Sequence, residues 1–221
     1  MNISFTAPFK IIDISQPVNS KSACFPGDVP FSKEVTLTYK DSGIVNLTAF
    51  KMSPHVGTHA DAPNHMKGEL EDPGGCASDL PLSSFIGKAQ VLDLSPLTRA
   101  IKPDDVLAHF EPDERLPERI LFKTRHHIRY DVFEDDYAYV SVELAELLSD
   151  HSVKLIELYT PFVDHIDSKT LDAHAVLLKG GLTWLENLDL SRAQAGIYQL
   201  VALPLKMEEL EASPVRAVLI C

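Results

Sequence analysis

The spacing of hydrophobic positions changes along the chain and separates two kinds of predicted structure. Residues 45–52 alternate between apolar and polar side chains, which is typical of a strand with one buried face. The apolar run 9–14 predicts another strand. Between these two segments, the Pro-Gly pair within residues 24–28 predicts a turn, and the Gly- and Pro-containing residues 69–78 predict a loop.

From residue 89 onward, apolar runs of strand length alternate with segments of helical character. Pro103 begins one helix because two Asp residues follow in its first turn, Ser141 is the expected N-cap of a second, and Asp172 that of a third, which Gly180 ends. Strands are predicted at 89–94, 120–123, 153–158, 182–185, 197–203 and 215–220, and helices at 103–110, 142–148 and 172–179.

This alternation predicts the fold class and the number of domains. Strands that alternate with helices form parallel βαβ units with right-handed crossovers, so we expect an α/β sheet. No repeat, linker or low-complexity segment interrupts residues 1–221, which we therefore expect to form a single domain.

Histidines gather in one short segment, His55–His65, which reads HVGTHADAPNH. The chain has nine histidines in 221 residues, so an eleven-residue window would hold about 0.5 if they were scattered by composition alone. This window holds three histidines and one aspartate. Imidazole and carboxylate groups are ligands that zinc and related cations favour, so we expect a metal site here. His65, at the end of the run, is expected to stay free for proton transfer.

The glycine and prolines within and beside this segment make a helix an unfavourable conformation for it. In an extended chain, His59 and Asp61 point the same way because side chains alternate along a strand. His55 would then be too far away, unless Gly57 takes a positive φ and curls the chain back. Thr58 is expected either to hydrogen-bond a ligand carboxylate or to be an ordinary strand threonine.

A catalytic metal site needs further ligands from distant segments. His174 lies in the first turn of a predicted helix and Glu186 directly follows a predicted strand, and α/β folds place functional groups at such ends. The pair His126 and His127 is the rival source. We rank it lower because arginines flank it on both sides and would repel a cation.

Composition excludes several classes of partner. The net charge of −12 argues against nucleic acid and against an anionic membrane surface. No apolar run is long enough to span a bilayer, and the first fifteen residues lack the pattern of a secretory signal. Three cysteines, far apart in sequence, indicate a reducing compartment, so we expect a cytoplasmic protein.

The run HVGTHADAPNH resembles the HxGTHxDxPxH signature of the cyclase family of metal-dependent hydrolases, which includes bacterial kynurenine formamidases. The segments IDIS at 12–15 and FPGD at 25–28 are also similar to this family, as are residues 174–190 and the C-terminal stretches LVALPLK and SPVRAVLI. The resemblance therefore covers most of the chain. It implies a compact α/β domain of the swivelling β/β/α type, with a mixed sheet and flanking helices, assembled as a homodimer or homotetramer.

The resemblance also implies a role for each site residue. His55 and His59 would bind a first metal ion and His174 a second, while Asp61 and Glu186 would bridge both. His65 would be the general acid/base, and Phe25 would contact the substrate. Two Zn²⁺ ions are expected, with Mn²⁺ as the alternative. The implied reaction is hydrolysis of a small amide, namely an aryl formamide such as N-formylkynurenine.

Two positions depart from the kynurenine formamidase pattern: Phe25 replaces a tryptophan, and Ala175 stands where a second histidine is frequent. A branch that opens the lactam of isatin with manganese carries glutamine at the position of Glu186, so glutamate here favours the two-metal branch. The alternatives are a hydrolase of isatin or another cyclic amide, a non-enzymatic module with a structural metal, and an inactive relative.

Overall fold

The structure is a computed structural model that describes residues 9–70 and 72–221. Residues 1–8, in which we expect no secretory signal, lie outside the described residues. The strands of the main sheet are β1 (Ile11–Asp13), β4 (His59–Asp61), β5 (Ile86–Asp93), β7 (Arg119–Lys123), β9 (Leu155–Leu158), β10 (Thr183–Glu186), β11 (Gly196–Val201), β12 (Ala212–Pro214) and β13 (Val218–Ile220). Two short pairs lie apart from it, β2 (Ser32–Leu37) with β3 (Leu47–Lys51) and β6 (Ala100–Ile101) with β8 (Tyr139–Val140). The α-helices are α1 (Tyr39–Ser42), α2 (Pro103–Leu107), α3 (Val142–Asp150) and α4 (Asp172–Lys179), and 3₁₀ turns span Pro63–His65, Ala77–Asp79 and Leu82–Ser84.

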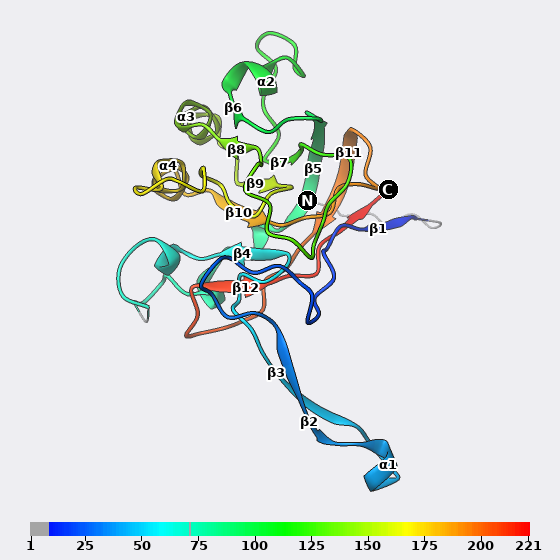
Figure 1. Ribbon diagram of the computed structural model, residues 1–221. Helices are drawn as coiled ribbons and strands as arrows, with labels where there is room; N and C mark the ends of the chain where they lie inside the picture. Colours follow the sequence, from blue (N-terminus) through cyan, green and yellow to red (C-terminus); the bar gives the residue numbers. More distant parts are fainter. Residues whose placement is uncertain (1–8, 71) are drawn as a thin grey trace.

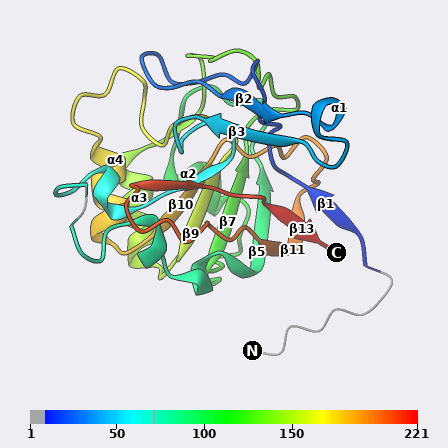
Figure 2. The ribbon, with the colours of Figure 1, turned by 90° about the horizontal axis from the view of Figure 1, so that it is seen from below.

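The main sheet is mixed and has the order β1-β13-β11-β5-β7-β9-β10-β4-β12. Its central strands β5, β7, β9 and β10 are parallel, and the strands on either side of them pair antiparallel (Figures 1 and 2). Helices α3 and α4 pack beside each other on one side of the parallel strands. The α/β class predicted from the sequence is confirmed, and so is the mixed sheet that the resemblance to the cyclase family implies.

The central strands are apolar on both faces, which explains why they read as short continuous hydrophobic runs. On β7, Ile120 and Phe122 pack with α3 and α4, whereas Leu121 faces the other way. On β9, Ile156 and Leu155 divide between the same two clusters. The cluster that contains Leu121 and Leu155 also includes residues from both ends of the sheet, from β1 and β13 at one end and from β4 at the other. The sheet therefore curls over its own second face.

Most predicted elements are present, with differences at their ends. Ser141 is the N-cap of α3, and its hydroxyl accepts a hydrogen bond of 3.2 Å from the backbone N–H of Leu144. Helix α2 ends at Leu107 rather than at Phe110. The N–H groups of His109 and Phe110 bond three residues back, which tightens the chain into a turn. Instead of one C-terminal strand, the chain forms β12 and β13.

The predicted cap of α4 is wrong. Asp172 is the first helical residue, and Leu171 is at the cap with a left-handed φ of 51°. The free backbone N–H groups of Ala173 and His174 instead donate to the carboxylate of Asp164, at 3.0 and 3.1 Å. A side chain from the preceding loop thus supplies the acceptor that helix N-termini require.

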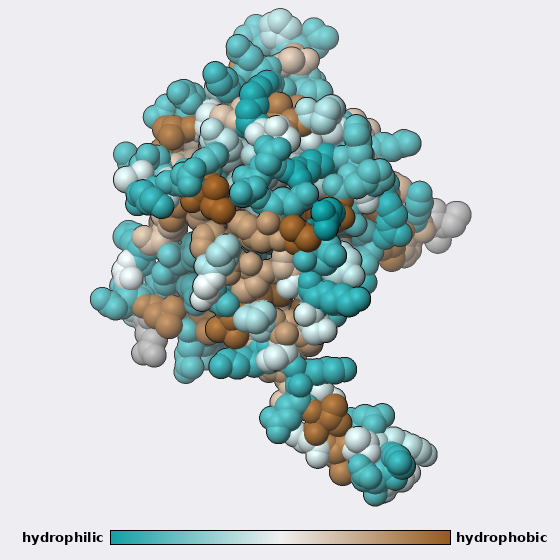
Figure 3. All heavy atoms as spheres, viewed as in Figure 1, coloured by the Kyte–Doolittle hydropathy of each residue, from teal (hydrophilic) through white to brown (hydrophobic). Residues whose placement is uncertain are grey.

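The segment predicted by alternation at 45–52 forms a strand that projects from the body. Strands β2 and β3 make an antiparallel hairpin with α1 at its tip, and this arm extends away from the main sheet (Figure 1). All five residues of β3 are exposed, including Leu47 and Phe50, and the Phe50 ring stacks on Phe31 at 6.0 Å. Apolar side chains therefore lie on the surface of the arm (Figure 3). In the described ranges, no helix is long and apolar enough to cross a membrane.

Candidate metal centre

The pairing of two short strands brings three expected ligands together. Strands β4 and β10 are antiparallel, with His59 opposite Glu186. Nε2 of His59 lies 3.4 Å from Oδ1 of Asp61 and 3.4 Å from Oε2 of Glu186. His59 and Asp61 point to the same face of β4, as the alternation of strand side chains predicts. The Nε1–H of Trp184, on β10, donates a 2.9 Å hydrogen bond to Oδ2 of Asp61 and fixes its orientation.

The loop before β4 returns His55 to the same place. Gly57 has a φ of 72°, as predicted, and a Cβ there would lie 2.8 Å from a methyl group of Val18. Its carbonyl accepts a 2.9 Å hydrogen bond from Nδ1 of His59, which leaves Nε2 of that ring with its lone pair free. Nδ1 of His55 lies 3.1 Å from Oδ1 of Asp61. A positive φ at glycine therefore closes the ligand cluster.

Helix α4 contributes the remaining imidazole. Nδ1 of His174 lies 2.5 Å from Oδ2 of Asp164, and Nε2 lies 3.6 Å from Oε1 of Glu186. The same Glu186 oxygen accepts a 3.0 Å hydrogen bond from the backbone N–H of Val163. Each oxygen of the Glu186 carboxylate thus faces a different histidine.

The expected ligands form two overlapping groups, and the atoms within each group lie no more than 4.8 Å apart. One consists of His55, His59 and Asp61, and the other of Asp61, His174 and Glu186. In the described part of the chain, His59 Nε2, His174 Nε2 and Asp61 Oδ1 are buried without a hydrogen-bond partner. Buried polar atoms are costly when unpaired, and these three atoms are all metal-ligand types, so the residues fit divalent cations.

The electrostatics of the cluster favour positive charge. Burial opposes protonation of His59, but the carboxylates of Asp61 and Glu186 outweigh it and raise its pKa to about 10. Burial likewise opposes protonation of His174, whose pKa Asp164 and Glu186 raise to about 9. Metal binding displaces such protons, so a bound cation would replace them as the positive charge beside these carboxylates.

His65 lies at the rim of this cluster. It ends a 3₁₀ turn, and its Nε2 is 3.9 Å from Oδ2 of Asp61. Its ring centroid is 4.6 Å from that of His55 and 6.4 Å from that of His174. Burial lowers the pKa of His65, whereas the pKa values of His55, His59 and His174 are raised, so the His65 ring is neutral and able to accept a proton.

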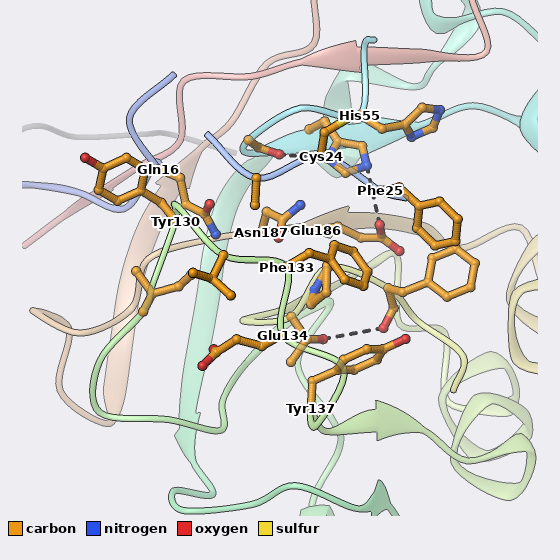
Figure 4. Close-up of a pocket in the computed structure, with 18 of the residues that line it drawn as sticks. Gln16, Cys24, Phe25, His55, Tyr130, Phe133, Glu134, Tyr137, Glu186 and Asn187 are labelled. Carbon is orange, nitrogen blue, oxygen red and sulfur yellow. Dashed lines mark hydrogen bonds and ion pairs between the residues drawn. The ribbon is translucent and has the colours of Figure 1, made fainter. Parts of the chain in front are cut away.

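The cluster opens into a cavity of about 540 Å³. Phe25 lines it, next to the predicted turn, and packs edge-on against Phe133 with ring centroids 5.5 Å apart. Phe162 is 6.0 Å from Phe25. In Figure 4 the rings of Phe25 and Phe133 lie beside Glu186. The metal-ligand groups therefore face an aromatic slot wide enough for a small molecule.

Two sequence expectations need correction or refinement. Thr58 contacts no ligand carboxylate: its hydroxyl donates to the carbonyl of Asn187 at 2.6 Å and accepts from the N–H of Gln16 at 2.9 Å. The rival pair His126 and His127 is exposed and belongs to neither ligand group of the described residues.

Sequence reasoning missed three residues that support the ligands. Asp164 holds His174, Trp184 holds Asp61, and Glu211 lies 3.5 Å from Nε2 of His55. Of these three, Trp184 alone could have been found from the sequence, because it is the single tryptophan of the chain and lies two residues before Glu186. Asp164 and Glu211 are ordinary acidic residues in loops, and nothing local marks them.

Together, the curled mixed sheet and the His/Asp/Glu cluster at its β4–β10 pair define an α/β protein with a candidate metal centre. The Cyclase family model matches residues 12–165. The chain belongs to the cyclase family. It is 40% identical over 208 residues to the kynurenine formamidase of Bacillus thuringiensis, covering 94% of this chain and 96% of that one. It is 41% identical over 216 residues to that of Paracidovorax citrulli, covering 97% and 98%.

Solved structures share the fold. A "predicted metal-dependent hydrolase" from Bacillus stearothermophilus superposes with a TM-score of 0.79 at 25% identity, covering 97% of this chain and 99% of that one. Isatin hydrolase A from Labrenzia aggregata superposes with a TM-score of 0.82 at 22% identity, covering 96% and 93%. The second likeness concerns the fold alone.

From the contact between Asp164 and His174 we predict an effect on metal affinity. Asp164→Asn removes the charge that orients the His174 ring, and the loss of such a partner weakens metal binding about 10- to 100-fold. We expect titration of the metal-free protein with Zn²⁺ to show this loss at one of two sites. Asp167→Asn, at a carboxylate that is 86% exposed, is the matched control. Equal affinities in the two variants would contradict the role of Asp164.

Proposed function

We propose that the protein is a metal-dependent hydrolase that cleaves an aryl formamide such as N-formylkynurenine. The observation that carries this proposal is the set of buried, unpartnered ligand atoms of His59, Asp61 and His174 at an aromatic-lined cavity. The relatives named kynurenine formamidase, at about 40% identity over nearly the whole chain, support the substrate class.

The ligand geometry supports two ions rather than one. Asp61 belongs to both ligand groups, and the two oxygens of Glu186 face His59 and His174 separately. Carboxylates placed in this way can bridge two cations. Bound divalent cations, zinc first and manganese as the alternative, would supply Lewis acidity and lower the pKa of a water molecule towards neutrality.

His65 is the residue we propose to move the proton. Its neutral ring lies beside the ligands at the cavity, where it can accept a proton from the attacking water. The same ring can then protonate the nitrogen of the leaving arylamine. Histidine suits this exchange because its unperturbed pKa of about 6.5 lies close to neutral pH.

Phe25 and Phe133 are the residues we propose to hold the aryl ring. The two rings meet edge-on and both line the cavity, and aromatic pairs favour offset or edge-to-face contacts. Phe25 can occupy the substrate-contact position that tryptophan has in the kynurenine formamidase pattern. Ala175, the other departure from that pattern, is on the exposed side of α4, one residue from the buried His174.

A purely structural metal site is less consistent with this geometry. Structural zinc sites are closed four-ligand sets, frequently rich in cysteine. Here the ligand groups open onto a cavity, and none of the three cysteines belongs to either group within the described residues.

A substrate panel tests the proposal directly. The protein is stripped with a chelator, reloaded with Zn²⁺ or Mn²⁺, and assayed on N-formylkynurenine, formanilide and isatin. We expect hydrolysis of the formamides by the reloaded protein, none by the stripped protein, and about two bound ions by elemental analysis. Opening of isatin alone would favour the cyclic-amide alternative, and failure on every amide would contradict hydrolase activity.

The proton-transfer role makes a separate prediction. His65→Ala is expected to keep its bound metal and to lower kcat on N-formylkynurenine about 10²- to 10⁴-fold, because a positioned acid/base contributes that much. Steady-state kinetics and elemental analysis of the same preparation measure the two quantities. His126→Ala, at an exposed histidine outside the ligand groups, is the control. If His65→Ala loses a metal ion, His65 is a ligand instead.

We further propose that the protein is a homodimer or homotetramer in which the β2–β3 arm contacts a second copy. Leu47 is 52% exposed and Phe50 66% exposed on an arm that stands clear of the main sheet. Isolated two-stranded hairpins are marginally stable in water, and apolar groups gathered on a surface indicate an interaction site.

Size-exclusion chromatography with light scattering tests the proposed assembly. The wild type is expected to give a mass of two or four chains of 24.5 kDa, and Leu47→Ser with Phe50→Ser to shift it towards one chain. Thr48→Ser, on the same exposed strand, should leave the mass unchanged. A monomeric wild type, or a double variant with unchanged mass, would contradict the arm contact.

A further inference from the structure

A second set of unpartnered polar groups lies in the same cavity, away from the metal ligands. Among the described residues, Nε of Arg125 and the hydroxyl of Tyr159 are buried without a hydrogen-bond partner. Both residues line the cavity. Both atoms carry hydrogen-bond donors, and a buried donor without an acceptor costs free energy. These groups do not belong to the metal centre, so they require a different explanation.

The sheet places these two donors at the carboxyl ends of neighbouring strands. Strands β7 and β9 are parallel neighbours, with Phe122 opposite Leu158, so the residues that follow them emerge side by side. Tyr159 comes directly after β9, and Arg125 two residues after β7. The carboxyl ends of parallel strands are where α/β sheets bind ligands.

The charged groups at the carboxyl ends of these strands are complementary to a zwitterion. Nη1 of Arg125 lies 2.5 Å from Oε2 of Glu134, which also lines the cavity. Arg125 keeps its Nε–H free, and Glu134 keeps the capacity for a further donor. Tyr159 is 2% exposed, and burial raises its pKa, so its hydroxyl stays protonated. Arg125, Glu134 and Tyr159 all line the same cavity.

Other charged groups near Tyr159 do not supply the missing acceptor. Glu157 and Asp189 also act on its pKa, yet its hydroxyl has no partner in the described residues. Burial raises the pKa of Glu157 well above its usual value, so that carboxyl is uncharged. Arg129 lines the cavity as well, but its side chain is 63% exposed and lies beside Asp131.

We propose that Arg125, Tyr159 and Glu134 form a subsite for the zwitterionic α-amino-acid group of the substrate. The substrate carboxylate accepts from Nε of Arg125 and from the Tyr159 hydroxyl, and the substrate ammonium donates to Glu134. This inference rests on the proposed function, because it assigns the part of the substrate farthest from the scissile amide.

The spacing of the strands agrees with the length of such a substrate. Strand β9 lies between β7 and β10. Arg125 follows β7 and Glu186 ends β10, so the two residues belong to strands that are two spacings, or roughly 10 Å, apart. In N-formylkynurenine about seven bonds separate the formyl carbon from the carboxylate carbon, which a bent chain spans in roughly 8 Å. In Figure 4 the Phe133 ring lies between Glu186 and Glu134, so an aryl ring held between these two residues would pack against it.

A pair of substrates isolates the contribution of this subsite. N-formylkynurenine and 2-formamidoacetophenone share the formamide, the ring and the ketone, and only the first carries the amino-acid group. We expect the metal-loaded wild type to prefer N-formylkynurenine at least tenfold in kcat/KM. Tyr159→Phe and Arg125→Gln should lower kcat/KM for N-formylkynurenine about tenfold or more, mainly through KM, and leave the truncated formamide unaffected. Tyr198→Phe, whose hydroxyl contacts the carbonyl of Gln194 elsewhere, is the control.

The outcomes separate the subsite from the reaction. Equal losses on both substrates, or no loss on either, would overturn the subsite while leaving the hydrolase intact. If neither formamide is hydrolysed, the proposed function fails and the subsite is judged by binding alone. In that measurement the metal-loaded wild type should bind L-kynurenine at least tenfold more tightly than 2-aminoacetophenone, and Tyr159→Phe should remove the difference. A wild type that does not discriminate between these two compounds would refute the subsite.

Discussion

The antiparallel pairing of β4 with β10 is the interaction on which the rest of the site depends. Its register puts His59 opposite Glu186, and the hydrogen bond from Trp184 to Asp61 continues the same alignment. A shift by one residue would turn every one of these side chains to the other face of the sheet. The curl of the sheet supports the pairing, because β4 closes over the second face of the parallel strands. Ligand geometry and core packing are therefore set by the same backbone contacts.

Much of this arrangement was readable in the sequence because the signals were local. Strand alternation placed His59 and Asp61 on one face, and Gly57 between the ligands indicated a reversal that its φ of 72° confirms. The ends of predicted elements pointed to His174 and Glu186, which the fold brings together with the others. The α/β class followed from the change of period after residue 89.

The remainder depended on contacts between segments far apart in the chain. Asp164 caps α4 and orients His174, but the sequence assigned the cap to Asp172 because that residue stands at the helix start. For Thr58 the sequence left a carboxylate partner and an ordinary strand position equally open, and in the fold its hydroxyl bonds backbone groups. Tyr159 and Arg125 had no distinguishing pattern at all. Such roles depend on which loops contact one another above the sheet, and the spacing of hydrophobic residues does not determine those contacts.

The β2–β3 arm is continuous with the cavity at both of its strands. The turn that holds Phe25 leads into β2, and β3 leads through Ser53 to His55. Backbone and side-chain hydrogen bonds close this base, from Ser53 N–H to the Val29 carbonyl at 2.9 Å and from His55 N–H to the Ser53 hydroxyl at 3.2 Å. The base of the arm is therefore built from the same backbone segments that carry one aromatic ring of the cavity and one imidazole of the ligand cluster.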